Sequence, residues 1–357
     1  MAIKTDRKKS EVDKELEQIL KARAPRIKVV GVGGAGNNTI TRLMEVGIVG
    51  AETVAVNTDA QDLLFSDANY KLLIGKEVTK GFGAGGDPKV GEEAAKESKD
   101  DIKKALEGAD MVFVTCGLGG GTGTGASPIV AEVAKKLGAL VIGIVTLPFS
   151  MEGRVRMRNA KLGFENLRRN VDTLIVIPND RLLEVVPDVS IAAAFKVCDE
   201  ILVNAVKGIT ELITKPGLVN LDFADVRAVM QKGGMAVIGV GESSSKNRAI
   251  EAVDKALHHP LLVVDIEGAK GALINVVGGP DITIKEANQV VEQVANYLDT
   301  EAKIIWGAQI DKNVKEKMRV FVVITGVSFE FEEGFTGAEE TGTITKIDED
   351  LGIEFIE

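Results

Sequence analysis

The chain has 357 residues, a formal net charge of −10 and 45% apolar residues, with aromatic residues at only 4%. Its length predicts about two domains, and its acidic balance argues against a general binder of nucleic acid or anionic membranes. Two cysteines form no disulfide framework, and two adjacent histidines argue against a histidine metal site or triad. We find neither a signal peptide nor a membrane span and expect a cytoplasmic protein.

The first half of the chain alternates strand, glycine-rich turn and helix. Before it, residues 1–25 carry dense mixed charge with apolar residues at helical spacing, which predicts an N-terminal helical extension. Strands are expected at 27–30, 53–56, 72–74, 111–115, 140–146 and 173–177, and helices at 38–46, 89–106, 128–137 and 154–169. This alternation predicts a doubly wound parallel sheet with helices on both faces.

A long helix and a second, smaller domain follow. Apolar residues step by three and four through 190–214, which predicts one linking helix about 36 Å long. Further on, strands are expected at 235–240, 261–266, 272–277, 304–310 and 320–327, and helices at 247–257 and 284–298. This pattern indicates an α+β domain with a mixed sheet. The predicted divisions are 1–25, 26–189, 190–215, 216–328 and a flexible acidic tail at 329–357.

Residues 117–125 read Gly-Leu-Gly-Gly-Gly-Thr-Gly-Thr-Gly, between an apolar strand and a helix. Glycines let the backbone approach a ligand closely, and successive N–H groups at a helix start form a cradle for phosphate. The alternative is a flexible glycine linker, but linkers are not normally clamped between a buried strand and an amphipathic helix. The run therefore favours a phosphate site.

A second glycine turn, Gly31-Val-Gly-Gly-Ala-Gly-Asn-Asn38, follows the first strand and matches G-x-G-x-x-G. Alone it suggests a dinucleotide enzyme, but Asn57 stands where an acidic residue is expected. No Gly-Lys-Ser/Thr follows a glycine cradle, so a P-loop lysine is absent. Two cradles instead favour a nucleoside triphosphate. A third glycine loop, at 81–88, is either a γ-phosphate sensor or a plain surface turn.

Charged and aromatic side chains follow these loops. Glu152 could accept from ribose hydroxyls and Arg154 or Arg156 could meet a phosphate, although a solvated helix start explains them too. Phe195 and Asp199 lie four apart on the long helix and so share a face. They could stack on a purine and pair with guanine, or they could serve core packing and a salt bridge.

The last constellation is Asn220, Asp222 and Asp225, beyond the end of that helix. Two carboxylates and an amide could polarise a water or hold a cation, whereas the alternative is a helix start capped by aspartate. These acids lie at the far end of a helix about 36 Å long from the glycine loops. If they are catalytic, they act on a nucleotide held by a neighbouring molecule.

Six loops, in order along the chain, make residues 26–328 resemble the FtsZ family, the prokaryotic relatives of tubulin. They lie at 31–38, 57–63, 81–88, 119–125, 178–182 and 220–227. Thr41-Arg42, Lys196–Glu200 and a tail that ends in acidic rather than basic residues look more archaeal than bacterial.

The resemblance implies a tubulin-like fold and a GTPase that polymerises head-to-tail into protofilaments of the cell-division ring. It places Mg²⁺ on the GTP phosphates and water, with no dedicated protein cage. Asp222 and Asp225, with Asn220, would enter the next subunit's site and activate the attacking water. The residues that it places at GTP are Gly33, Gly34, Ala35, Gly36, Asn37, Asn38, Asp59, Gly85, Gly86, Gly117, Gly120, Gly121, Thr122, Gly123, Thr124, Glu152, Arg156, Asn179, Phe195 and Asp199.

The implied partners are further copies of the chain, plus membrane-tethering and regulatory division proteins that bind the tail, in the cytoplasm at midcell. Nucleic acid is not among them. Two competing functions are weighed. An NAD-dependent oxidoreductase built on residues 31–36 would need a histidine or a Lys-Tyr pair near the sheet's switch point, and none is evident. A non-hydrolysing tubulin-like regulator would lack Asp222 or Asp225, and both are present.

Overall fold

The computed structural model describes residues 25–181, 191–214, 217–219, 221–258, 264–311 and 316–329. Within them, ten strands form one sheet in the order β3-β2-β1-β4-β5-β6-β7-β10-β8-β9. The strands are β1 (Ile27–Val32), β2 (Ala51–Asn57), β3 (Tyr70–Leu73), β4 (Met111–Gly117), β5 (Leu140–Leu147), β6 (Thr173–Pro178), β7 (Gly234–Ser243), β8 (Ala269–Gly278), β9 (Leu298–Ile310) and β10 (Met318–Thr325). The predicted tubulin/FtsZ-like α/β fold with a mixed carboxyl-terminal sheet is confirmed.

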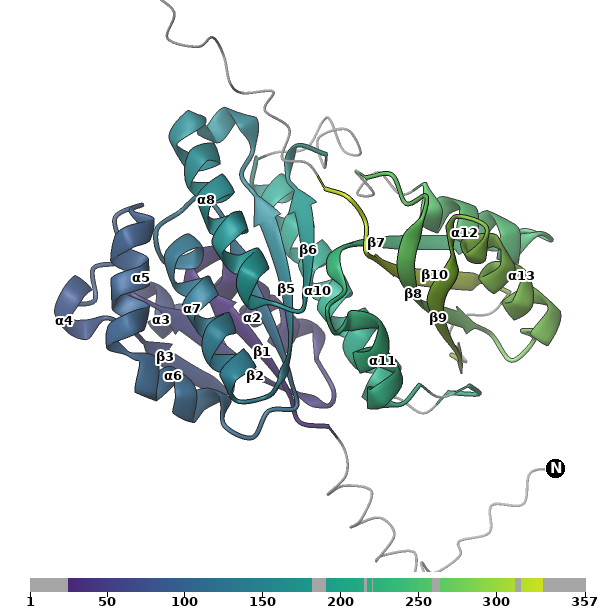
Figure 1. The fold of residues 1–357 in the computed structure, drawn as a ribbon, viewed down its shortest axis with the longest axis horizontal. Coiled ribbons are helices and arrows are strands. Elements are labelled where there is room, and N and C mark those ends of the chain that lie inside the picture. The colour runs from purple at the N-terminus through teal and green to yellow at the C-terminus, as the bar shows by residue number, and fades with distance from the viewer. Residues whose placement is uncertain are drawn as a thin grey trace, which may run out of the picture.

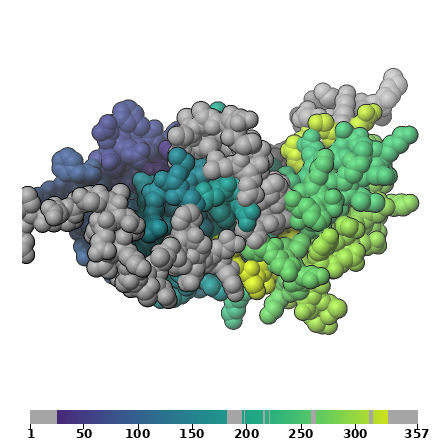
Figure 2. Space-filling model, turned by 90° about the horizontal axis from the view of Figure 1, so that it is seen from above, coloured from purple at the N-terminus to yellow at the C-terminus, as the bar shows by residue number. Residues whose placement is uncertain are grey.

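The sheet is parallel from β3 to β7 and mixed beyond it. β10 runs antiparallel to both β7 and β8, and β9 pairs in parallel with β8. The two halves meet where Thr173–Ile175 of β6 pair with Gly234–Ala236 of β7. Figure 1 shows the elements before α10 on one side of this junction and β7 to β10 with α12 and α13 on the other. The same two groups form the two ends of the space-filling view (Figure 2).

Helices cover both faces of the sheet. They are α2 (Gly33–Val46), α3 (Ala60–Phe65), α4 (Lys76–Thr79), α5 (Pro88–Glu97), α6 (Lys99–Leu106), α7 (Thr122–Lys136), α8 (Arg154–Asn170), α10 (Ile191–Thr214), α11 (Phe223–Met230), α12 (Arg248–Leu257) and α13 (Ile284–Ala295), with a 3₁₀ turn at Ser150–Glu152. One core lies under α5 to α8, α12 and α13, and the other under α2, α10 and α11. Alternate residues of β5 enter the two cores, as Val141 and Ile142 do, which explains its unbroken apolar sequence.

Several predicted boundaries are wrong. Two helices start earlier than expected, α2 at Gly33 and α7 at Thr122, so the glycine turns form their first residues. The expected helix over 89–106 is two helices that break at Ser98, whose hydroxyl accepts from the Gly75 N–H at 2.9 Å. The glycines in the first turns of α2 and α7 are poor helix formers, and tertiary packing outweighs that preference.

Other differences lie in the second half of the chain. The helix expected to reach residue 298 ends at Ala295, and β9 begins at Leu298. No strand includes Val264–Ile266, and the remainder of the strand expected at 261–266 lies outside the described residues. The helical extension predicted at 1–25 and the tail predicted at 329–357 also fall outside them, except for Pro25 and Phe329. Among the described helices, none is long and apolar enough to cross a bilayer.

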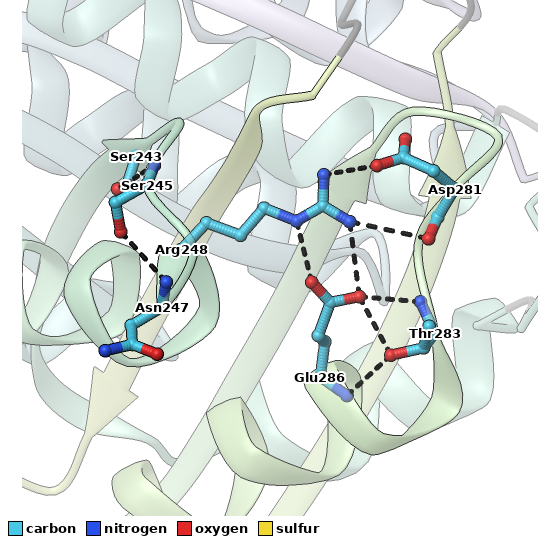
Figure 3. Close-up of polar contacts among 7 residues, drawn as sticks. All are labelled: Ser243, Ser245, Asn247, Arg248, Asp281, Thr283 and Glu286. Carbon is cyan, nitrogen blue, oxygen red and sulfur yellow. Dashed lines mark hydrogen bonds and ion pairs between the residues drawn. The ribbon is translucent and has the colours of Figure 1, made fainter.

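An arginine on α12 ties two helix starts together in the second half. Arg248 donates to Glu286 at 2.7 Å and to Asp281 at 2.5 Å, and its side chain is 9% exposed. Glu286 also accepts from the N–H and hydroxyl of Thr283, the residue that caps α13 (Figure 3). The guanidinium lowers the pKa of Glu286 to about 2. This cluster therefore fixes α12 against the first turn of α13.

Candidate functional site

A cleft of about 290 Å³ opens where β1, β4 and β5 end. In open parallel sheets, ligands bind outside the carboxyl ends of the strands. Thirteen of the residues predicted to hold nucleotide line it, from five separate parts of the chain. They are Gly33, Gly34, Ala35, Asn38, Gly117, Gly120, Gly121, Thr122, Gly123, Glu152, Arg156, Asn179 and Asp199.

Two helices point their amino termini at this cleft. Neither α2 nor α7 has a side-chain cap or an acidic residue in its first turn. By contrast, Asp59 caps α3 and Asp87 caps α5. The first N–H groups of a helix have no intrahelical partner and carry partial positive charge. Two such uncapped starts facing one cleft make a site for a polyanion such as a phosphate chain.

The glycines at these two helix starts allow the loops to interlock. A Cβ on Gly33, whose φ is +73°, would lie 2.8 Å from the nitrogen of Gly123. A Cβ on Gly117 would lie 2.8 Å from that of Ala35. The hydroxyls of Thr58 and Thr122 share a hydrogen bond of 2.6 Å. The two cradles therefore form one continuous wall.

Glu152 and Arg156 form an ion pair on the cleft wall. Arg156 donates to Glu152 at 2.6 Å, and the other carboxylate oxygen accepts from the Phe149 N–H at 2.8 Å. Arg156 is more than half exposed, whereas Glu152 is mostly covered. An arginine held by one contact at the mouth of the cleft keeps donors free for a phosphate or ribose oxygen.

Asn179 and Asp199 supply a polar end to the cleft. Asn179 is buried, and among the described residues its Oδ1 has no hydrogen-bond partner. Burial raises the pKa of Asp199 to about 6, against the opposing effects of a Thr39 hydrogen bond and the Arg42 charge. A buried orphan amide is costly unless a ligand pairs with it. Asn179 and Asp199 together can read a base that has both donors and acceptors.

Six other residues predicted at the nucleotide do not line this cleft. Gly36 faces the Thr115 carbonyl, where a Cβ would lie at 2.6 Å. The side-chain nitrogen and oxygen of Asn37 are buried without a partner in the described chain. Thr124 turns inward and accepts from the Gly119 N–H at 2.9 Å. Asp59 caps α3.

The other two, Gly85 and Gly86, belong to the third glycine loop. Both have positive φ, and the loop lies directly behind Gly121, where a Cβ would be 2.8 Å from that of Ala84. The loop backs the phosphate cradle without lining it. A role for these six residues at GTP stays a prediction. Phe195 lies in α10, but its side chain is outside the described part, as is Asn220.

Sequence reasoning missed six residues of the lining. They are Val32, Leu118, Thr146, Pro148, Cys198 and Leu202. Two signals could have found them. Thr146 lies near the end of β5 and Pro148 directly follows that strand, and Cys198 and Leu202 lie four apart on one face of α10 next to Asp199. Burial raises the pKa of the Cys198 thiol to about 12, so it serves as apolar wall.

Asp222 and Asp225 form a reciprocal cap at the start of α11. Asp222 accepts from the Asp225 N–H at 2.7 Å, and Asp225 accepts from the Asp222 N–H at 3.2 Å. The helix-capping alternative is therefore what the structure contains. Each of these two hydrogen bonds uses one oxygen, so each carboxylate keeps a second oxygen that can accept from a water.

Helix α11 lies at the opposite edge of the sheet from the cleft. Arg227 of α11 donates to the carbonyl of Gly138 at 3.2 Å, just before β5 begins. Thr146, near the end of β5, lines the cleft. A strand rises about 3.3 Å per residue, so the end of β5 near Gly138 and the end near Thr146 are about 25 Å apart. Asp222 and Asp225 cannot reach the cleft of their own chain.

Comparisons with known proteins identify the family of the chain. The profile of the Tubulin/FtsZ family GTPase domain matches residues 26–187, and that of the FtsZ family C-terminal domain matches residues 234–328. Cell division protein FtsZ 1 of Thermococcus kodakarensis is 59% identical over 350 residues, which cover 96% of this chain and 93% of that protein. FtsZ 1 of Methanocaldococcus jannaschii is 60% identical over 325 residues, covering 91% and 89%.

Solved structures show the same fold. An FtsZ dimer from M. jannaschii, described as empty, superposes with a TM-score of 0.84 at 60% identity, over 89% of this chain and 92% of that one. CetZ1 of Haloferax volcanii, a GDP-bound monomer, superposes with a TM-score of 0.74 at 26% identity, over 85% and 94%. The chain thus belongs to the FtsZ family of cell-division GTPases, as its ordered glycine loops predicted.

Proposed function

We propose that this chain hydrolyses GTP at sites that exist only between neighbouring copies. Within one copy, the uncapped starts of α2 and α7 hold the phosphates. Arg156 and Glu152 contact phosphate and ribose at the mouth of the cleft, and Asn179, Asp199 and Phe195 read guanine. The cleft lining and the orphan Oδ1 of Asn179 support this assignment.

Mg²⁺ fits this cleft only as a companion of the phosphates. The acidic residues that line the cleft are Glu152 and Asp199, and Glu152 is already paired with Arg156. The described residues contain no group of three potential metal ligands. A metal ion would therefore take most of its oxygen ligands from GTP and water, where it neutralises phosphate charge.

The observation that carries the shared site is the position of Asp222 and Asp225 at the edge opposite to the cleft. A head-to-tail contact brings one copy's acid pair to the next copy's nucleotide. There the free carboxylate oxygens orient a water and accept its proton as it attacks the γ-phosphate, and GDP leaves.

Exposed apolar side chains at both ends suit such stacking. Phe82 is 86% exposed beside the third glycine loop, and Leu218 is 64% exposed just before α11. Single exposed apolar residues are common, but these two occur at the ends that a head-to-tail contact would bury. Self-association also agrees with the dimeric M. jannaschii relative.

The remaining predictions are part of the same proposal. Residues 26–189 form the GTP-binding domain, 190–215 the linking helix and 216–328 the domain that completes the neighbour's site. The protofilaments belong to the cytoplasmic division ring, and tethering and regulatory division proteins bind the tail. The order of the two matched family domains supports this division of the chain.

The test is GTP turnover per molecule against protein concentration, with GTP and Mg²⁺ in excess and sedimentation measured in parallel. Turnover should rise steeply where protein begins to sediment and vanish on dilution. Turnover that stays constant at high dilution would place a complete site within one chain. GTP binding, measured separately on the diluted protein, should persist.

A further inference from the structure

Helix α8 is strongly basic on an otherwise acidic protein. Between Arg154 and Asn170 it carries six lysines and arginines against one acidic residue, Glu165. All six basic side chains are exposed. Arg158 and Arg169 form no ion pair with any residue that the structure describes. Such a concentration of exposed positive charge creates an attractive potential for an acidic partner.

The exposed face of α8 is also partly apolar. Arg154, Arg158 and Leu162 follow at intervals of four and therefore share one face, and Leu162 is 51% exposed. Leu162 and Arg169 line a second cleft, of about 210 Å³, together with Pro128 and Ile129 of α7 and Lys89 and Glu92 of α5. This cleft offers apolar contacts at Leu162, Pro128 and Ile129, with Lys89 and Arg169 beside them.

The described chain ends beside this helix. Phe329 packs on Phe164 of α8, with ring centroids 5.6 Å apart. Lys161 and Arg168 are three residues before and four residues after Phe164, so they lie on the same flank. The 28 residues that follow contain ten acidic residues and one lysine. They end in Leu-Gly-Ile-Glu-Phe-Ile-Glu, which alternates acidic and apolar side chains.

We propose that the acidic tail, residues 330–357, docks on the basic face of α8 of its own chain, with its terminal apolar residues over the cleft at Leu162. The charge of the tail complements that of the helix. Its reach is sufficient: a flexible chain of 22 residues, the number from Phe329 to Leu351, would span about 26 Å. That matches the length of α8, about 26 Å for 17 residues.

The test is zero-length carbodiimide cross-linking of the full chain without nucleotide, which joins carboxylates to lysines in direct contact. Mass spectrometry should find tail carboxylates joined to Lys161 and Lys89 at low salt. These products should disappear at 1 M salt, where the Debye length falls to about 3 Å. Cross-links that survive high salt, or reach Lys246 and Lys285 equally often, would refute docking on α8.

Two matched variants and an isotope mixture complete the design. The pair Arg158→Gln and Arg169→Gln should abolish the cross-links, whereas Lys246→Gln with Lys285→Gln should retain them at the same change in charge. Thermal unfolding should be unchanged in both, because all four side chains are exposed. In a mixture of ¹⁴N-labelled and ¹⁵N-labelled chains, each cross-linked product should join a tail and an α8 peptide that carry the same isotope, because both come from one chain. Mixed products at the random share would place the tail on a second copy and overturn docking within one chain.

Discussion

Asp199 is a half-buried carboxylate at the end of a cleft whose other end favours phosphate. If it accepts from the N1–H and amino group of guanine, Asp199→Asn should weaken GTP binding by about tenfold or more, because an amide donor then faces these donors. The same variant should bind XTP better than the wild type does, since xanthine has a carbonyl in place of the amino group. Fluorescent-nucleotide titrations measure both affinities.

The control for this substitution is Glu200→Gln. Glu200 is the next residue on α10 but pairs with Arg42 and is not part of the cleft lining. It should leave the preference for GTP over XTP unchanged. A preference for GTP that survives in Asp199→Asn would remove this carboxylate from base recognition.

The raised pKa of Asp199 predicts a pH dependence of GTP binding. Its pKa of about 6 means that the carboxylate is ionised at pH 7 and protonated at pH 5. Only the ionised form accepts both guanine donors. GTP affinity should therefore fall as the pH is lowered through about 6. The Asp199→Asn variant should show no such fall in the same titration.

Loss of Arg248 should destabilise the second half of the chain. Arg248→Ala leaves the Glu286 carboxylate mostly buried and without its cation. We expect a decrease of about 2 kcal/mol in the free energy of unfolding. Arg319→Ala, which breaks an exposed pair with Glu242, should cost less than about 1 kcal/mol. Urea unfolding measures both, and equal losses would contradict the argument.

The same cluster predicts how stability depends on acid. Folding lowers the pKa of Glu286 from 4.5 to about 2. Its contribution is therefore complete above about pH 4.5 and is lost as the pH falls toward 2. The difference in stability between wild type and Arg248→Ala should shrink over that range. A difference that stays constant down to pH 2 would mean that the arginine acts through packing alone.

At the scale of elements, close packing of α5 on α7 depends on glycines such as Gly125 and Gly91. A Cβ on Gly125 would lie 1.9 Å from the Pro88 carbonyl oxygen, which is backbone and cannot move aside locally. Gly125→Ala should therefore lower stability by about 1–3 kcal/mol. Gly120→Ala, with open space around it, should not. Thermal unfolding compares them, and equal melting temperatures would contradict this packing.

The sequence predicted most elements but not where some of them start. β4 and β5 are continuous apolar runs, so both were found. The sequence does not predict the starts of α2 and α7, because glycines such as Gly123 disfavour a helix locally. Only the contact of Gly123 with Gly33 explains why the helices start there. The break at Ser98 depends on a hydrogen bond to Gly75, 23 residues away. Contacts between distant residues leave no local pattern.

For the whole molecule, a shared site predicts complementation between two inactive variants. The Asp222→Ala variant has an intact cleft but a damaged acid pair, whereas the Asp199→Asn variant has an intact acid pair but a damaged cleft. Each alone should hydrolyse GTP slowly, but in a 1:1 mixture about a quarter of head-to-tail contacts combine an intact cleft with an intact acid pair. Phosphate release from the mixture should exceed the average of the separate variants. Activity equal to that average would argue against sharing.

The sequence predicted the glycine loops that line the cleft, and the length of the linking helix predicted that Asp222 and Asp225 lie far from them. Glycine loops after strands identify the phosphate wall because strand ends converge in any parallel sheet. The cap formed by Asp222 and Asp225 has the same sequence pattern whether it is structural or catalytic, and its distance from the cleft excludes a catalytic role only within its own chain. That distance depends on the complete fold.

The separation of cleft and α11 also gives a row of these chains a direction. A row of any length has one more cleft than it has junctions, so one end displays a cleft that no acid pair enters. The other end displays an acid pair with no nucleotide before it. In the proposed head-to-tail assembly the two ends would therefore differ in chemistry without any further protein, and the nucleotide in the terminal cleft would outlast those behind it.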